Sequence, residues 1–229
     1  MHQRLILVLA ATAIAVIWQL PFGRQLLYPL TLLATFAHEF GHGLTALLVG
    51  ANFDHLQLNA DGSGSAVWQG NPGPIAIAAI AAGGLIGPSL AGISLLLLAR
   101  STPRARGLLG LLAALLLVCM VVWARNVFGI FFLLISAAVL ALAARYFSDV
   151  WAALLLHLIA VTLCLSWFTD LDYMFSAEAV VNGVRYPSDS AVIAQALWLP
   201  YWFWGGLVAL LSLSVLALGV IRVGRSTRR

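Results

Sequence analysis

Charged residues are scarce in this chain, and lysine is absent. Of the 229 residues, 9% are charged and 62% are hydrophobic, and the mean hydropathy is +1.01. In soluble domains about half of the residues are apolar and about a quarter are charged. The composition therefore excludes a soluble globular domain and predicts an integral membrane protein.

Cysteine is also rare. Cys119 and Cys164 both lie within apolar runs, and neither has the sequence spacing of a metal site. They are predicted to be small buried residues rather than metal ligands.

The net charge is +4, and all of the positive side-chain charge comes from arginine, because the chain has no lysine. Loop arginines that face anionic lipid headgroups account for this charge without a nucleic-acid partner. The lipid bilayer is therefore an expected partner, and no nucleic acid is expected.

Seven apolar runs are long enough to cross a bilayer as helices, which needs about 17 to 25 residues. They cover residues 4–22, 28–50, 74–99, 107–125, 127–145, 150–169 and 197–222. The first run could be a signal peptide, but its small-residue triplet at 13–15 lies inside the run, which favours a retained helix. We predict an all-α, polytopic membrane domain of six to seven transmembrane helices that covers residues 1–229.

The polar stretch 51–74 separates the second and third runs. Leu56 and Leu58 alternate with polar neighbours, residues 61–62 are the turn sequence Asp-Gly, and residues 66–68 resume an extended pattern. This pattern predicts a short β-hairpin. Its edge either binds an extended peptide by strand addition or belongs to an ordinary connecting loop, and the pattern supports the two equally.

Two histidines and a glutamate interrupt the second run, in the sequence AHEFGHG. On a helix, His38 and His42 lie one turn apart and project from one face. Imidazoles at this spacing can hold two positions of a zinc tetrahedron, and Glu39 can take a proton from a metal-activated water. A charge at the bilayer centre costs about 2.5 kcal/mol or more on insertion scales, so Glu39 indicates a functional site.

Small residues surround this motif. Gly41 and Gly43 flank His42, where they either leave room for a substrate or let a neighbouring helix approach. The third run carries AAGGLIGPSLAG, which favours close helix packing or opens space beside a site.

A catalytic zinc usually has three protein ligands, so the third must come from elsewhere in the chain. The candidates along the chain are His157, Asp170, Asp172, Glu178 and Asp189. A simpler role exists for most of them: an interhelical hydrogen bond for His157, a solvated helix end for the aspartates at 170 and 172, and helix capping for Asp189. Spacing alone does not choose among them.

Together these motifs resemble the site-2-protease-like intramembrane zinc metallopeptidases, in particular their compact peptidase B-like branch. The resemblance covers most of the chain. It rests on HEFGHGLTALLVG, the segment with DGSG, the glycine-rich AGGLIGPSLAG, the Arg-Asn pair in WARNVFGI, and SDSAVIAQ before the last run. The first motif is highly specific, and the others support it.

The resemblance implies a fold, an activity and a location. It implies a zinc-dependent endopeptidase that cleaves a membrane protein or peptide within or beside the membrane, in a multi-pass protein of a bacterial cell membrane. Carried over by motif, His38 and His42 become the zinc ligands and Glu39 the general base.

The third ligand departs from the usual pattern of this family. Its typical members take that ligand from an Asp-Gly pair on a later helix, and none of the later aspartates here precedes glycine. The B-like branch resembles this chain around residues 188–190, so Asp189 is predicted as the third ligand, with Asp170 second. Asn126 becomes a candidate for holding substrate or an oxyanion, although it equally fits a turn between two helices.

Two other functions fit parts of the pattern. A membrane scaffold or regulator could keep the zinc site without cutting its substrates. A small transporter could use the histidines and Glu39 as a proton or ion path, but the sequence has no inverted repeat to support this function.

Overall fold

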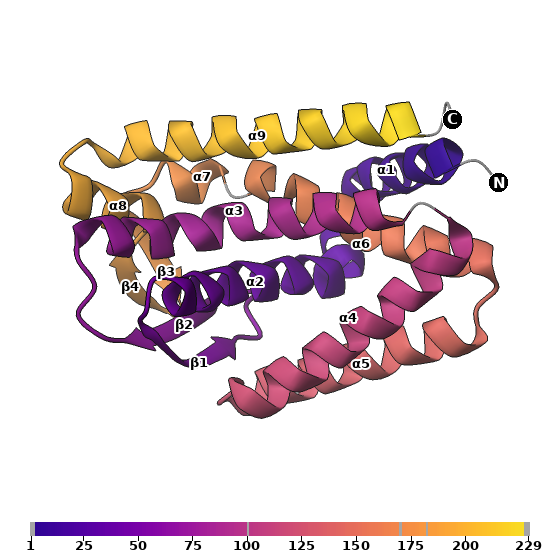
Figure 1. Ribbon diagram of the computed structural model, residues 1–229, viewed down its shortest axis with the longest axis horizontal. Helices are drawn as coiled ribbons and strands as arrows, with labels where there is room; N and C mark the ends of the chain where they lie inside the picture. Colours follow the sequence, from indigo (N-terminus) through magenta and orange to yellow (C-terminus); the bar gives the residue numbers. More distant parts are fainter. Residues whose placement is uncertain (1–2, 100, 170, 182, 227–229) are drawn as a thin grey trace.

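The structure is a computed structural model that describes residues 3–99, 101–169, 171–181 and 183–226. It is a bundle of long helices with two small β-hairpins at one end (Figure 1). The long helices are α1 (Gln3–Gln19), α2 (Gly23–Leu48), α3 (Pro74–Leu98), α4 (Thr102–Val122), α5 (Val127–Tyr146), α6 (Asp149–Thr169) and α9 (Tyr201–Ser226). The short elements are β1 (Asn52–Leu58), β2 (Gly64–Gln69), α7 (Leu171–Met174), β3 (Glu178–Val181), β4 (Val184–Pro187) and α8 (Asp189–Leu197).

Each of the seven predicted runs overlaps one of the long helices, although most of these helices begin or end outside the predicted bounds. Within the described residues, five helices are long and apolar enough to cross a membrane, and these are α3, α4, α5, α6 and α9. Helix α1 carries a shorter apolar stretch, Leu5–Ile14. The prediction of an all-α polytopic membrane protein is therefore confirmed.

Helix α9 begins later than the last apolar run, which starts at residue 197. Trp198 ends α8 in a left-handed conformation with a φ of 72°, and α9 starts only at Tyr201. Pro200 precedes α9, where a missing backbone N–H is tolerated. The aromatic residues at 198–204 therefore belong to a junction between two helices and to the first turn of the second helix.

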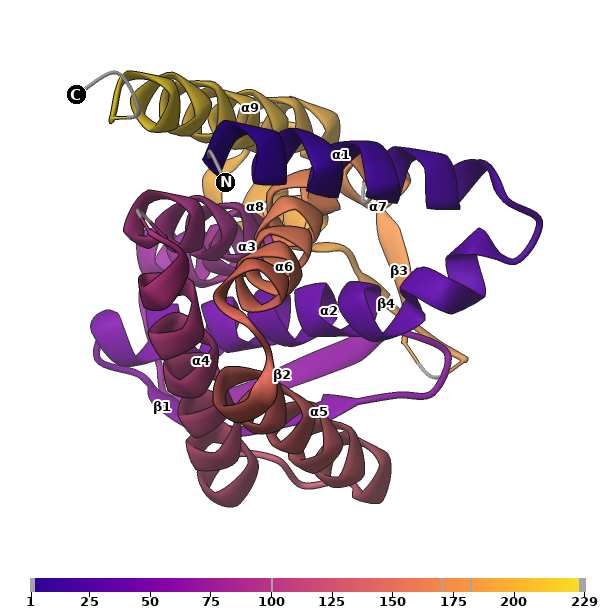
Figure 2. The ribbon, with the colours of Figure 1, turned by 90° about the vertical axis from the view of Figure 1, so that its right-hand side faces the viewer.

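Helix α3 lies at the centre of the bundle, packed against α2, α6, α8 and α9. Figure 2 shows α3 beside α6, with α2 on one side and α9 on the other. A β-carbon added at Gly83 would collide with Thr45 of α2, and one added at Gly92 would press on the backbone of Ala160 in α6. The glycines of the third run therefore permit close helix packing, which was one of the two roles predicted for them.

Packing also explains the two glycines that flank His42. A β-carbon at Gly41 would collide with the carbonyl of Gly83 in α3, and one at Gly43 would enter the ring of Phe53 in β1. Both positions are filled by neighbouring groups of the chain. Of the two predicted reasons for these glycines, close approach of a neighbouring element is the one that these contacts support.

The predicted hairpin after the motif helix is confirmed. Strands β1 and β2 pair antiparallel, and the turn includes Gly62, whose φ of +91° favours glycine. Two hydroxyl groups of α2 hold the turn: Tyr28 donates to the carbonyl of Ala60 at 2.9 Å, and Thr35 donates to the carbonyl of Gly62 at 2.9 Å. The hairpin is thus fixed to the motif helix.

One edge of this hairpin is covered, and the other faces the motif helix. The N–H of Leu56 donates to the carbonyl of Trp123 at 2.9 Å, and its carbonyl accepts from Arg125 at 3.2 Å. In an antiparallel pair, two directly opposed residues point their N–H and C=O groups either at each other or both away from each other. Leu56 lies opposite Ala66 and points these groups away from β2, so the N–H and C=O of Ala66 point toward the outer edge of β2. That outer edge has no strand partner in the described part of the chain.

A second hairpin, β3–β4, was not expected from the sequence. It lies between α7 and α8, and Gly183 in its turn has a φ of +79°. We call residues 171–197, all described except 182, the cap segment. The cap segment follows α6 and places its short elements at the same end of the bundle as β1 and β2 (Figure 1).

Candidate metal and catalytic site

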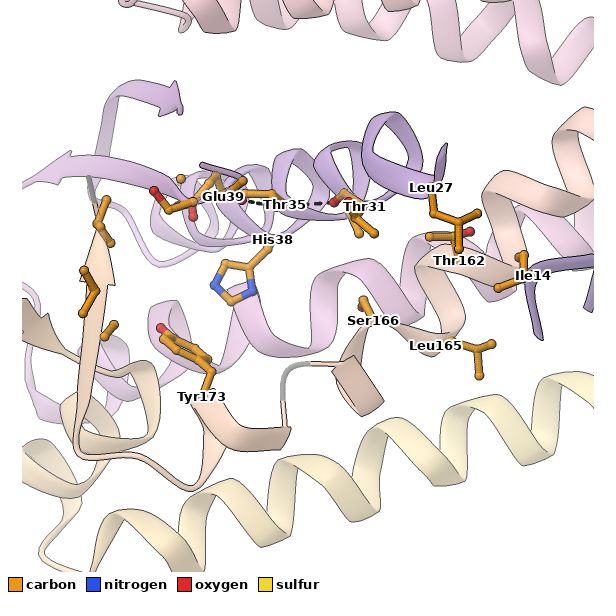
Figure 3. A pocket seen from close by; sticks show the side chains of 17 residues that line it. Ile14, Leu27, Thr31, Thr35, His38, Glu39, Thr162, Leu165, Ser166 and Tyr173 are labelled. Carbon is orange, nitrogen blue, oxygen red and sulfur yellow. Dashed lines mark hydrogen bonds between the residues drawn. The ribbon is translucent and has the colours of Figure 1, made fainter. Parts of the chain in front are cut away.

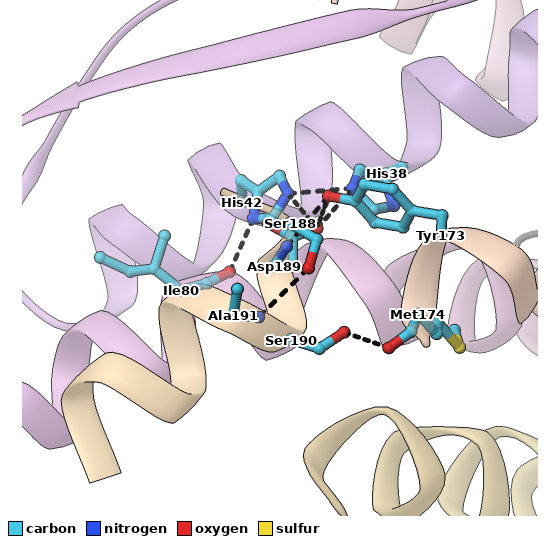
Figure 4. Close-up of polar contacts among 9 residues, drawn as sticks. All are labelled: His38, His42, Ile80, Tyr173, Met174, Ser188, Asp189, Ser190 and Ala191. Carbon is cyan, nitrogen blue, oxygen red and sulfur yellow. Dashed lines mark hydrogen bonds and ion pairs between the residues drawn. The ribbon is translucent and has the colours of Figure 1, made fainter. Parts of the chain in front are cut away.

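His38 and His42 lie on one face of α2, as their spacing predicts. Their Nε2 atoms are 3.0 Å apart, and the two rings meet edge to face at a centroid distance of 4.7 Å. Both nitrogens therefore point toward the same place beside the helix, from which a third group approaches (Figure 4).

That third group is Asp189, at the start of α8. Its Oδ2 atom lies 3.0 Å from Nε2 of His38 and 3.3 Å from Nε2 of His42. Three atoms bound to a tetrahedral zinc at about 2.0–2.1 Å are separated from each other by about 3.3 Å. The three side chains thus have the donor atoms and the mutual distances that a zinc ion needs.

The ring of His42 is held by helix α3. Its Nδ1 lies 2.8 Å from the carbonyl oxygen of Ile80, which leaves Nε2 turned toward His38 and Asp189. A β-carbon at Gly84, one turn further along α3, would collide with the same ring. A carbonyl partner on the far nitrogen is the common way to fix the orientation of a metal-binding histidine.

Glu39 is buried, with 6% of its surface exposed, and lies beside the trio rather than in it. It faces strand β2, and Glu39, Gly64 and Ala66 line the same cavity. Gly64 lies close as well, since a β-carbon there would lie 2.7 Å from Cγ of Glu39. Strand β2 therefore places the carboxylate.

Two cavities meet at His38 and Glu39. One, of about 400 Å³, extends along α2 toward α1 and α6, and His38 and Tyr173 reach into it (Figure 3). The other, of about 520 Å³, runs between β2, the cap segment and α3. Both cavities are lined by His38, Glu39, Gly64 and Tyr173. His38 and Glu39 are therefore accessible from two directions, whereas His42 and Asp189 line only the second cavity.

Asp189 does not cap α8, the simpler role that the sequence offered for it. Ser188 is the N-cap residue, and its Oγ accepts from the N–H of Ala191 at 3.2 Å. Burial by itself raises the pKa of the Asp189 carboxyl, but the charge of His42 and hydrogen bonds to both histidines lower it below its ordinary value. An ionised carboxylate is the form that binds a metal.

The other candidates for the third ligand are not seen at the metal site in the described residues. Asp170 lies outside the described residues. Asp172 is exposed on α7, and Glu178 forms an exposed ion pair with Arg185 at 2.9 Å. Nδ1 of His157 lies 2.7 Å from the carbonyl of Ala153 in its own helix, not from a neighbouring helix as expected. In the described part of the chain, these three do not join the trio.

Asn126 is occupied by the hairpin. Its Oδ1 accepts from the N–H of Leu58 at 3.2 Å, and its Nδ2 donates to the carbonyl of Leu58 at 2.5 Å. The amide thus pairs with β1 as a further strand would. The predicted role at a turn between two helices therefore agrees with the structure. The predicted role in holding a substrate does not, because both polar atoms of the amide already bond to Leu58.

Sequence reasoning missed Tyr173. Its hydroxyl lies 2.8 Å from Oδ2 of Asp189, and its ring stands edge-on to His38 at a centroid distance of 6.1 Å. A tyrosine in the sequence TDLDYMF carries no metal-site signal, because its partner lies sixteen residues further along the chain. Only the fold of the cap segment brings the two together.

A polytopic helical membrane protein in which two histidines, an aspartate and a glutamate converge has the features of a metal-dependent membrane hydrolase. A family model described as Peptidase M50B-like matches residues 6–219, and the chain belongs to this family. This confirms the resemblance found in the sequence and makes the chain a membrane protein of the metallopeptidase class. Comparison with curated proteins and with solved structures gives no match.

Proposed function

We propose that this protein is a zinc-dependent endopeptidase that cleaves a peptide bond within or beside a bacterial cell membrane, as one metallopeptidase domain covering residues 1–229. The observation that carries the proposal is the convergence of His38, His42 and Asp189, with Glu39 buried next to them. A carboxylate beside two imidazoles and a third ligand is the arrangement of zinc hydrolases.

Each of these residues has a defined role in the proposal. His38, His42 and Asp189 would hold the zinc, which supplies a polarised water and a positive charge for the substrate carbonyl. Glu39 acts as general base and later returns the proton to the leaving amine. Its close contact with Gly64 of β2 keeps the carboxylate at the junction of the two cavities.

The substrate would bind in an extended form. A helix hides its carbonyls in hydrogen bonds, so a membrane segment must unwind before it can be cut. The outer edge of β2 borders the larger cavity beside His38 and Glu39, and its backbone groups at Ala66 point outward. Strand addition there would hold an unwound segment next to the general base.

The test is cleavage by the purified protein in liposomes, with single-span membrane peptides as substrates and mass spectrometry of the products. The wild type should cut at defined positions. Glu39→Gln removes the base but keeps the size of the side chain, and should lower the rate by about 10²- to 10⁴-fold. Full cleavage by Glu39→Gln would contradict the proposal, and zinc binding without any cleavage would favour a scaffold.

A further inference from the structure

Tyr173 makes two hydrogen bonds to a single residue, Asp189. The tyrosine hydroxyl donates to Oδ2 of the carboxylate at 2.8 Å and accepts from the backbone N–H of the same residue at 3.1 Å. With its lone pair engaged by the N–H, the hydroxyl proton is directed at Oδ2. The aspartate is thereby held at its backbone and at its carboxylate by one group.

The oxygen that Tyr173 contacts is the one that matters for the metal. Oδ2 of Asp189 is also the atom that lies 3.0 Å and 3.3 Å from the two histidine Nε2 atoms. The tyrosine ring stands edge-on to His38, with an angle of 75° between the ring planes. One side chain therefore touches two of the three predicted ligands (Figure 4).

The position of Tyr173 relative to Asp189 is fixed by the serines on either side of the aspartate. Ser188 donates to the carbonyl of Ser176 at 2.6 Å, and Ser190 donates to the carbonyl of Met174 at 2.6 Å. Both serines are fully buried, as is Met174. These bonds tie α7 and the residues between α7 and β3 to the start of α8, so the tyrosine and the aspartate cannot move independently.

We propose that Tyr173 is a positioning residue for the metal site and holds Asp189 with Oδ2 turned toward the two histidines. The inference rests on the proposed function, because it takes Asp189 as a ligand. His38 and His42 are set by one helix, whereas an aspartate side chain on a short helix can rotate away. Outer-shell hydrogen bonds to ligands of this kind typically change metal affinity or activity by about 10- to 100-fold.

The experiment measures Co²⁺ binding to zinc-stripped protein in detergent, by its visible absorption and by competition with a chelator. Tyr173→Phe keeps the ring and removes the hydroxyl, and should bind Co²⁺ about 10- to 100-fold more weakly, with an altered absorption spectrum. Tyr28→Phe is the matched control, because it also removes one tyrosine hydrogen bond but at the hairpin turn. It should leave the affinity and the spectrum unchanged.

The possible outcomes separate this inference from the proposed function. Loss of Co²⁺ in Asp189→Ala together with wild-type affinity and spectrum in Tyr173→Phe would overturn the role of Tyr173 alone. Wild-type binding in Asp189→Ala would overturn the ligand set itself. If Tyr173→Phe does not fold, Ser190→Ala loosens the same contact with the tyrosine in place, and wild-type Co²⁺ affinity in that variant would also overturn the inference.

Discussion

Helix α2 and the cap segment both supply groups to the same point, but they fix those groups in different ways. Helix α2 presents His38 and His42 from one continuous helix of 26 residues, pressed against α3 where both helices carry glycine. The cap segment presents Asp189 and Tyr173 from short elements, joined by serine hydroxyls to backbone carbonyls. The first arrangement depends on close packing, and the second depends on individual hydrogen bonds.

This difference predicts different responses to substitution. A helix held by packing tolerates the loss of a polar group but not the addition of volume, because protein interiors are densely packed. A segment held by buried hydrogen bonds tolerates little loss of polar groups, since an unpaired buried carbonyl costs about 1–3 kcal/mol. The substitutions below add a methyl group on the packed side, remove a polar group from the cap segment, or remove the polar group of Asn126 that holds the first hairpin.

The largest effect is expected at Gly84, on the packed side. In Gly84→Ala the new β-carbon collides with the ring of His42 and must turn its Nε2 away from the site. Zinc affinity should fall by at least about 100-fold, because a ligand itself is displaced. Gly107→Ala in α4 is the control, since no atom lies within 4 Å of the added carbon, and its zinc affinity should match that of the wild type. Unchanged zinc affinity in Gly84→Ala would contradict the packing account.

The next effect is expected at Ser188, in the cap segment. Ser188→Ala removes the N-cap of α8 and the bond to the carbonyl of Ser176, and should lower the free energy of unfolding by about 1–3 kcal/mol. Ser214→Ala is the control: its Oγ donates to Leu210 one turn earlier in its own helix. Denaturant unfolding of both variants measures the difference, and equal stability would argue against the hydrogen-bonded cap.

A smaller effect is expected at Asn126, which lies outside both regions and holds the hairpin. Asn126→Ala removes two hydrogen bonds to the backbone of Leu58 and should cost about 1–2 kcal/mol of stability, with zinc content unchanged. Asn126→Asp keeps the acceptor for the Leu58 N–H but sets a carboxylate oxygen against the Leu58 carbonyl, so it should cost at least as much as Asn126→Ala. Loss of zinc in Asn126→Ala at retained folding would instead assign this residue to the site.

The smallest effect is expected on the exposed face of the β3–β4 hairpin in the cap segment. Arg185 and Glu178 form an ion pair in which the side chains are 78% and 57% exposed. Arg185→Ala should change the free energy of unfolding by less than about 1 kcal/mol, and less again at high salt. A larger loss would show that this ion pair between β3 and β4 stabilises the cap segment in addition to the serine contacts.

The same two regions show how far the sequence predicts the site. The spacing of His38 and His42 is a property of one helix, so their shared face follows from the sequence alone. The hairpin after α2 follows from alternating leucines and an Asp-Gly turn. Asp189 was chosen only through family resemblance, because nothing in the sequence says where α8 lies relative to α2.

What the sequence did not predict depends on contacts between distant segments. Tyr173 gains its role from a fold that brings α7 against α8, and the roles of the flanking glycines follow from groups on α3 and β1. The β3–β4 hairpin did leave a local signal, since Asn182-Gly183 is a typical hairpin turn sequence between two extended segments. That signal was within reach of the sequence, whereas the pairing of Tyr173 with Asp189 was not.

The most direct test is the zinc content of the purified protein, measured by mass spectrometry of the metal in three forms prepared identically. We expect one zinc ion per chain in the wild type and in Glu39→Gln, because Glu39 lies beside the ligands and not among them. In Asp189→Ala, zinc should be lost or far below stoichiometric. Stoichiometric zinc in folded Asp189→Ala would contradict the account that α2 and the cap segment build one metal site.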